Sequence, residues 1–427
     1  MRTWLWRTWL WLGLAVITSA VSWAYMRRVL LPWENSVNVT HGHLKEQMGD
    51  LYPRWVGTRE LLLNGRNPYG KEVSSEIQMA FYGHPIEQTV DKPKSEIVDE
   101  QRFVYPLYVV LLLAPTVHAD FAQLQTWAPV VFAVLVAISV WMWMDVLRWR
   151  PPPLAGVALV FFILSSPQIA QGLRLRQFGL FVAFLFAVAT WCVTRNRFFI
   201  AGVFLALSTI KPQMMALCLL WFLQWSVGEW KKRWPLAAGF GIALGVLVGA
   251  TELLQPGWPR DFIAGLEAYR KYFPTTSPLR LLLGNWAGGT LSLLVVTALL
   301  AFAWQKRRAA ADSREFIVTL ALFSIASTLV LPLLTPYNQV LLLLPVMMLL
   351  GDWKRLPRLG RIAFSVVAAW PWIASLALLM HPPRLDGLSR LPLLPVALVL
   401  LFPFLVSCLI FVPKPQSAQW KSVAASI

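Results

Sequence analysis

The sequence has few cysteines and histidines, and this scarcity excludes disulfide-stabilised and metal-centred folds. Cys192, Cys218 and Cys408 are the three cysteines among 427 residues, and each lies inside an apolar run. They form neither a disulfide framework nor a zinc-type spacing, so we expect small apolar packing residues. His41 and His43 are close together, but two ligands without a carboxylate cluster are weak evidence for a metal. We therefore expect no metal site and no organic cofactor.

Acidic residues are also scarce, with 21 Asp and Glu against 38 Lys and Arg, which gives a formal net charge of +17. Such an excess is compatible with nucleic-acid binding, but these basic residues are scattered through short loops between apolar runs. A preference for cytoplasmic positive charge and contact with anionic lipids explain the excess better. We expect membrane lipids, and no nucleic acid, as partners.

What the sequence does contain is apolar surface: 57% of its residues are hydrophobic and 23 are tryptophans. A water-soluble globule does not tolerate this content, whereas many membrane spans with interfacial tryptophan belts do. No internal repeat and no separate soluble domain are visible. The sequence predicts an all-α polytopic membrane protein of one domain, residues 1–427.

The first apolar run, Trp4 to Met26, lies behind Arg2 and Arg7. The sequence Thr18-Ser19-Ala20 would suit cleavage of a signal peptide. The run is longer and richer in tryptophan than a signal core, so we favour a retained first span. Residues 27–103 then form a large hydrophilic insertion, the first extracytoplasmic loop.

Residues 104–118 are apolar but would make a helix only about 22 Å long, against a hydrocarbon core of ~30 Å. If this segment spanned the membrane, the basic loops that follow would face outward. If it is re-entrant or interfacial, they all face the cytoplasm, as the charge rule requires. These loops are Arg148–Arg150, Arg195–Arg197, Lys231–Arg233, Lys306–Arg308 and Lys354–Arg361.

With that segment excluded, about twelve transmembrane helices are expected, and both termini are cytoplasmic. After the first span they are 125–147, 153–168, 178–194, 198–211, 213–229, 235–254, 286–304, 316–334, 338–350, 361–380 and 391–412. Residues 255–285 form a second outer loop, and residues 413–427 form a cytoplasmic tail.

Asp50 precedes an amphipathic run in the first loop. From Leu51 the apolar residues recur near helical spacing, and Gly65 supplies a helix stop. Such a helix would lie flat at the membrane surface with Trp55 in the interface. Asp50 then has two interpretations, a helix N-cap or a functional carboxylate at the outer face.

Lys211 interrupts an otherwise apolar stretch and lies on the same outer side in this topology. An unpaired ammonium at membrane depth costs about 3 kcal/mol on insertion scales, so this lysine calls for an anion. Alternatively, it reaches the interface beside Pro212. Arg174 and Arg176 likewise suit either a phosphate or the anchoring of a loop to lipid headgroups.

Four segments resemble glycosyltransferase family 87, whose members are membrane enzymes of the GT-C type that use polyprenyl-phosphate sugars. They are Asp50 with LLLNGRNPYG (Gly65, Asn67, Pro68 and Tyr69), then QGLRLRQ, LALSTIKPQ and TPYNQVLLLLP. Gln171-Gly172 stands in reversed order relative to the family motif. Downstream, Gln177 stands in place of the usual position of the motif. Tyr337, Asn338 and Gln339 stand where the family commonly has Trp and His.

The resemblance implies a GT-C-type bundle and a hexosyltransferase-like enzyme that works with inversion at the outer face of the plasma (inner) membrane, in the cell envelope. It implies Asp50 as the general base. The cations expected to bind the donor phosphate are Lys211, Arg174 and Arg176. The residues expected to bind sugar or acceptor are Arg54, Gln171, Gln177, Tyr337, Asn338 and Gln339.

The lipid-linked sugar, mannose or a related hexose or pentose, is a co-substrate, and the acceptor is a glycolipid or a polysaccharide. We expect a monomer. Two other classes stay open: a lipid-linked-sugar translocase without catalysis, and an O-antigen-type polymerase or ligase. The latter usually has its large loop late in the chain, whereas this chain has it first.

Overall fold

The computed structural model describes residues 2–40, 48–85, 101–272, 276–332, 335–381, 389 and 392–393. These segments are helical and contain no strand. In chain order the helices are α1 (Arg2–Tyr25), α2 (Leu31–Thr40), α3 (Leu51–Asn64), α4 (Lys71–Tyr82), α5 (Val109–Leu113), α6 (Phe121–Val146), α7 (Pro153–Ser165), α8 (Pro167–Arg174), α9 (Phe178–Thr194), α10 (Phe198–Ser208), α11 (Pro212–Gly228), α12 (Trp230–Leu254), α13 (Trp258–Tyr272), α14 (Pro278–Leu283), α15 (Asn285–Lys306), α16 (Arg314–Val330), α17 (Leu343–Gly351) and α18 (Arg358–Met380).

Within the described segments, five helices are long and apolar enough to cross a membrane, or six if the bent pair α7–α8 is one span. The five are Trp9–Ser36, Phe121–Val146, Trp230–Leu254, Asn285–Lys306 and Arg358–Met380. Helices α9 and α10 are apolar but shorter than the roughly 20 residues of a straight span. The count of about twelve spans therefore stays a prediction, and most of the expected last span, 391–412, lies outside the described residues.

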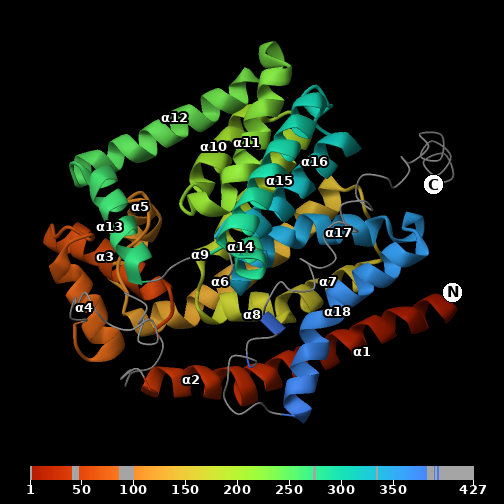
Figure 1. The fold of residues 1–427 in the computed structure, drawn as a ribbon, viewed down its shortest axis with the longest axis horizontal. Helices are drawn as coiled ribbons and strands as arrows, with labels where there is room; N and C mark the ends of the chain where they lie inside the picture. Colours follow the sequence, from red (N-terminus) through yellow and green to blue (C-terminus); the bar gives the residue numbers. More distant parts are fainter. Residues whose placement is uncertain are drawn as a thin grey trace.

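The N-terminal helix is longer than expected. A π-helical turn, Met26–Leu30, joins α1 to α2, so helix continues to Thr40, past position 27 where the first loop was expected to begin. Figure 1 shows this helix along one edge of the molecule, where α1 contacts α7 and α18.

The centre of the bundle is formed by helices that are apolar on every side. All residues of α16 from Phe316 to Leu329 are buried, as expected for a helix that other helices surround. Trp225 of α11 packs on Phe316 with ring centroids 4.9 Å apart. This rigid packing holds the helix ends that carry the polar residues described below.

Helices α10 and α12 cross at two glycines. A Cβ added to Gly202 would lie 2.1 Å from the carbonyl oxygen of Leu236, and one added to Gly239 would lie 2.1 Å from that of Phe199. Backbone therefore contacts backbone, as in membrane-helix pairs with small residues at the interface.

The two loops expected at the outer face form a single helical layer. Figure 1 shows α3, α4, α5 and α13 gathered at one side of the bundle. Asn67 donates a hydrogen bond to Asp261 Oδ2 at 2.8 Å, which joins the first loop to the second. Tyr108 donates from its hydroxyl to the carbonyl of Thr209 at 2.9 Å, which ties this layer to the end of α10.

Helix α3 begins after Asp50 and ends at Gly65, whose φ of +64° is the left-handed conformation of a helix stop. Its tryptophan differs from the expectation of an interfacial side chain. Trp55 is 5% exposed, its Nε1 donates to the carbonyl of Thr116 at 3.1 Å, and its ring packs on Phe121. The apolar face of α3 therefore packs against protein.

Residues 104–118 form one short helix, α5, and a 3-10 turn, Ala114–Thr116, which together are too short to cross a membrane. Leu107, Val109 and Val110 are buried, and α5 contacts α3. The segment thus belongs to the loop layer and contributes a wall beside Asp50.

Candidate active site

Asp50 is held at the start of α3 by its backbone. Its N–H donates to the carbonyl of Leu175 at 2.9 Å. Gly49, with φ of +72°, lets these two segments of the chain approach each other. A Cβ on Gly49 would lie 2.9 Å from that same carbonyl oxygen, so only glycine fits. Asp50 occupies the N-cap position, but its carboxylate makes no capping hydrogen bond. The side chain is therefore available for another role.

Lys211 lies in the turn between α10 and α11 and points into the protein. It is 5% exposed, and its Nζ donates to Asn338 Oδ1 at 2.9 Å and to Gln177 Oε1 at 3.2 Å. Its ammonium also lies 4.7 Å from the ring centroid of Tyr337. The side chain does not extend to the protein surface, and no Asp or Glu of the described segments forms an ion pair with it. A buried ammonium whose hydrogen-bond partners are neutral amides can accept an anion as a further partner.

A glycine that sequence reasoning missed makes room for this ammonium. A Cβ on Gly179, in the first turn of α9, would lie 3.4 Å from Lys211 Nζ and 3.5 Å from Asn338 Oδ1. Its position two residues after Gln177 was the only available signal, and a single glycine in an apolar helix is too common to single out.

Tyr337 connects the lysine to the carboxylate. Its hydroxyl donates to Asp50 Oδ2 at 3.4 Å, while Lys211 lies over its ring. Tyr337 belongs to the 3-10 segment Pro336–Leu342, which contacts α8 and α9. Asp50 and Lys211, far apart in sequence, thus lie on two sides of one aromatic side chain, within reach of a single bound substrate.

Arg54, one turn along α3, places a second cation beside Asp50. Its guanidinium donates to the backbone carbonyl of Asp50 at 2.7 Å and lies 4.4 Å from the ring centroid of Tyr105. Its Nε is buried without a hydrogen-bond partner. Burial acts to lower the pKa of Arg54, but Tyr105 and Asp50 outweigh it and the pKa is raised, so the charge is retained. Tyr105 was not predicted, because only the fold brings the loop layer together.

The other two arginines expected at the phosphate have partners elsewhere. Arg174 forms an ion pair with Glu34 of α2 at 2.6 Å. Arg176 donates from Nε to the carbonyl of Gln125 at 3.1 Å, and its guanidinium lies beside Gly49. Both therefore fix the surroundings of Asp50 in this structure.

Of the remaining residues expected to bind sugar, three lie near Lys211 or Tyr337 and one has a partner elsewhere. Gln177 and Asn338 bind Lys211, and Gln171 lies next to Gly172, which packs on Tyr337. The Oε1 of Gln171 is buried and has no hydrogen-bond partner. Gln339 instead donates to the carbonyl of Leu393 at 2.8 Å, away from the ammonium.

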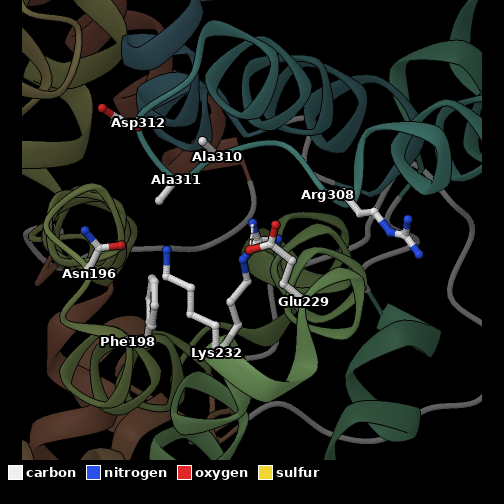
Figure 2. A pocket seen from close by; sticks show the side chains of 9 residues that line it. Asn196, Phe198, Glu229, Lys232, Arg308, Ala310, Ala311 and Asp312 are labelled. Atoms are coloured by element: carbon white, nitrogen blue, oxygen red, sulfur yellow. Dashed lines mark ion pairs between the residues drawn. The ribbon is translucent and has the colours of Figure 1, made fainter.

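A cavity of about 230 Å³ lies near the opposite ends of these helices, among the loops expected in the cytoplasm (Figure 2). Its carboxylates already have partners: Glu229 pairs with Arg233 at 2.9 Å, and Asp312 pairs with Arg148. Figure 2 shows Lys232 directed toward Asn196 across the cavity. The buried Arg233 binds three backbone carbonyls, so this region holds the helix ends together.

In the part of the chain that the structure covers, no three His, Cys, Asp or Glu residues come together in a way that could hold a metal ion.

The fold and this site define an all-helical membrane protein with a carboxylate and buried cations gathered under a helical loop layer. A family model, glycosyltransferase family 87, matches residues 103–336, which is more than half of the chain. The chain belongs to glycosyltransferase family 87, as the motifs predicted, and is a glycosyltransferase by that membership. Lys211 lies inside the matched region, whereas Asp50 and Arg54 precede it. Comparisons with curated proteins and with solved structures give no match.

Proposed function

We propose that this protein transfers a sugar, mannose or a related hexose or pentose, from a polyprenyl-phosphate donor to a hydroxyl of a glycolipid or polysaccharide. The reaction takes place at the extracytoplasmic face of the cell membrane and inverts the anomeric carbon. The observation that supports it most is the placement of the Asp50 carboxylate and the Lys211 ammonium on two sides of Tyr337.

The donor phosphate would lie against Lys211 and Arg54. In a partly desolvated site a cation stabilises a phosphate more strongly than in water, and an arriving phosphate favours the charged form of Lys211. Lys211 supplies a point charge, and Arg54 supplies the planar fork that matches phosphate oxygens. The phosphate is the leaving group, so the charge that it gains as the glycosidic bond breaks is compensated at once.

Asp50 would accept the proton of the attacking hydroxyl. The acceptor oxygen forms a bond to the anomeric carbon as the bond from that carbon to the phosphate oxygen breaks, and the phosphate leaves with the electron pair. One base and no covalent intermediate give a single displacement, hence inversion. No metal is required in this scheme.

Arg174 and Arg176 stay predictions as phosphate ligands. In this structure they contact Glu34 and Gln125, and those contacts would have to break before either arginine reached a phosphate at Lys211.

The test is to incubate the purified protein, reconstituted in lipid nanodiscs, with a panel of polyprenyl-phosphate sugars and a crude glycolipid acceptor fraction. We expect one donor to be consumed, with loss of about 10³-fold or more in rate for Asp50→Asn, as for removal of a general base. Asp120→Asn, at an exposed carboxylate before α6, is the matched control and should keep full activity.

Retention of transfer by Asp50→Asn would contradict the assignment of the base. If no donor is consumed but labelled donor crosses the bilayer of proteoliposomes, the protein is a translocase and the proposed reaction is wrong.

A further inference from the structure

Tyr337 contacts both charged groups of the candidate site with different parts of its side chain. The hydroxyl lies 3.4 Å from Asp50 Oδ2, and the ring face receives the Lys211 ammonium, 4.7 Å from the centroid. One face of the ring is thus occupied by a cation. Binding of sugar or acceptor by Tyr337 stays a prediction.

The backbone of Tyr337 is fixed on both sides. A Cβ on Gly172 of α8 would lie 3.0 Å from Tyr337 Cβ, so the helix packs directly against the root of the side chain. The preceding Pro336 is buried, and Asn338 donates its backbone N–H to the carbonyl of Thr335 at 3.1 Å. A residue held in this way can hold its neighbours in place.

We propose that Tyr337 is the positioning residue of this site: its hydroxyl orients the Asp50 carboxylate, and its ring holds Lys211 toward the substrate. The inference rests on the proposed function for its catalytic meaning. A general base must lie within hydrogen-bond reach of the proton that it accepts, so a donor that holds its carboxylate in place serves the reaction. A ring face that receives an ammonium stabilises the cation without neutralising it, so its charge stays available for a phosphate.

The separation of 3.4 Å from Asp50 is longer than the roughly 2.7 Å of a strong O–H···O bond. Catalytic hydrogen bonds are often long in ligand-free sites and shorten when substrate binds. The effect of the hydroxyl is therefore expected to be moderate rather than absolute.

Besides Tyr337, several charged or titratable groups lie around Asp50, and all must stay unchanged for the test to isolate the tyrosine. They are Arg54 of α3, Tyr105 before α5, Arg176 after α8 and Lys211 before α11. Tyr337→Phe leaves these groups in place and also removes the contacts of the hydroxyl with Thr335 and Gln177.

The split between kcat and donor KM for Tyr337→Phe is the first measurement. Without the donated hydrogen bond the Asp50 carboxylate is no longer held toward the acceptor, so kcat should fall by about threefold to tenfold. The KM for the donor should stay within about twofold, because the ring still faces Lys211. Tyr337→Leu removes the ring as well, and its donor KM should rise by about fivefold or more.

Tyr25→Phe is the matched control, because it removes a buried hydroxyl that donates to the carbonyl of Ser389, away from the site. A general loss of packing would lower kcat in both phenylalanine variants, whereas loss of the Asp50 contact lowers it in Tyr337→Phe alone. A kcat that is unchanged in Tyr337→Phe overturns the proposal.

A second measurement does not depend on transfer. Infrared difference spectra between the wild type and Asp50→Asn identify the antisymmetric stretching band of the Asp50 carboxylate. We expect this band to shift in Tyr337→Phe, where the donated hydrogen bond is lost, and an unchanged band would overturn the proposal. If the wild type transfers no sugar, the proposed function fails, and the infrared band still decides whether Tyr337 acts on Asp50.

Discussion

The environment of Lys211 is unusual for its side chain. An ammonium is strongly hydrated, yet here it is buried with two amide oxygens and an aromatic face as its neighbours. Gly179 leaves room for this arrangement, because a Cβ there would already contact Met214 Sδ at 3.3 Å, the ammonium at 3.4 Å and Asn338 Oδ1 at 3.5 Å. The position of the Lys211 ammonium therefore depends on the missing side chain at Gly179 as well as on its hydrogen bonds.

Gly179→Ala should weaken donor binding. The added methyl group would lie 3.3 Å from Met214 Sδ, which must give by a few tenths of an ångström, and it would place an apolar group 3.4 Å from Lys211 Nζ. We expect the donor KM to rise by about threefold to tenfold with little change in thermal stability. Gly241→Ala, a glycine of α12 with no atom within 4 Å of its added Cβ, is the control. Equal donor KM values in the two variants would contradict this description of Lys211.

At the scale of helices, apolar runs bounded by charge could be located from the sequence. Residues 178–194 were expected as a span and form α9 with those same bounds, because Gln177 and Arg195 end the apolar run on each side. The continuation of α1 into α2 was not predicted, because Arg27 and Arg28 interrupt the apolar run although they do not interrupt the helix. The direction of Trp55 also required the fold, since an amphipathic helix looks the same beside lipid or beside protein.

The crossing of α10 and α12 should be sensitive to one methyl group. Gly202→Ala would place a Cβ 2.1 Å from the carbonyl oxygen of Leu236, and backbone cannot yield without separating the helices. We expect a loss of about 2–3 kcal/mol in the free energy of unfolding, visible as a lower Tm in detergent. Gly245→Ala, on α12 with no atom near its added Cβ, should be neutral. A Gly202→Ala protein as stable as the wild type would contradict the close crossing.

At the scale of the whole molecule, charge and hydropathy predicted which segments are apolar helices and which are loops. They did not predict how the loops contact one another. Asp50 and Lys211 could be singled out because each is a charged residue beside an apolar run. Tyr105 could not, because its contact with Arg54 depends on how the segment before α5 folds onto α3. Family membership indicates a glycosyltransferase, and the site places Asp50 and Lys211 on two sides of Tyr337.

The topology can be tested with single cysteines in a background in which Cys192, Cys218 and Cys408 are alanine. Arg260 is an exposed residue of α13 in the loop expected outside, and Arg308 is an exposed residue of a loop expected inside. A membrane-impermeant maleimide should label Arg260→Cys on intact cells and Arg308→Cys only after permeabilisation. The reverse pattern would contradict the placement of the site at the outer face.

The most direct test of the central claim is a parallel measurement of donor affinity and single-turnover rate in Asp50→Asn and Lys211→Gln. If Asp50 is the base, Asp50→Asn should bind the polyprenyl-phosphate sugar with a Kd within about threefold of wild type and fail to transfer it. If Lys211 binds the phosphate, Lys211→Gln should lose about 1–2 orders of magnitude in donor affinity. Transfer at a normal rate by Asp50→Asn, or wild-type donor affinity in Lys211→Gln, would contradict the account.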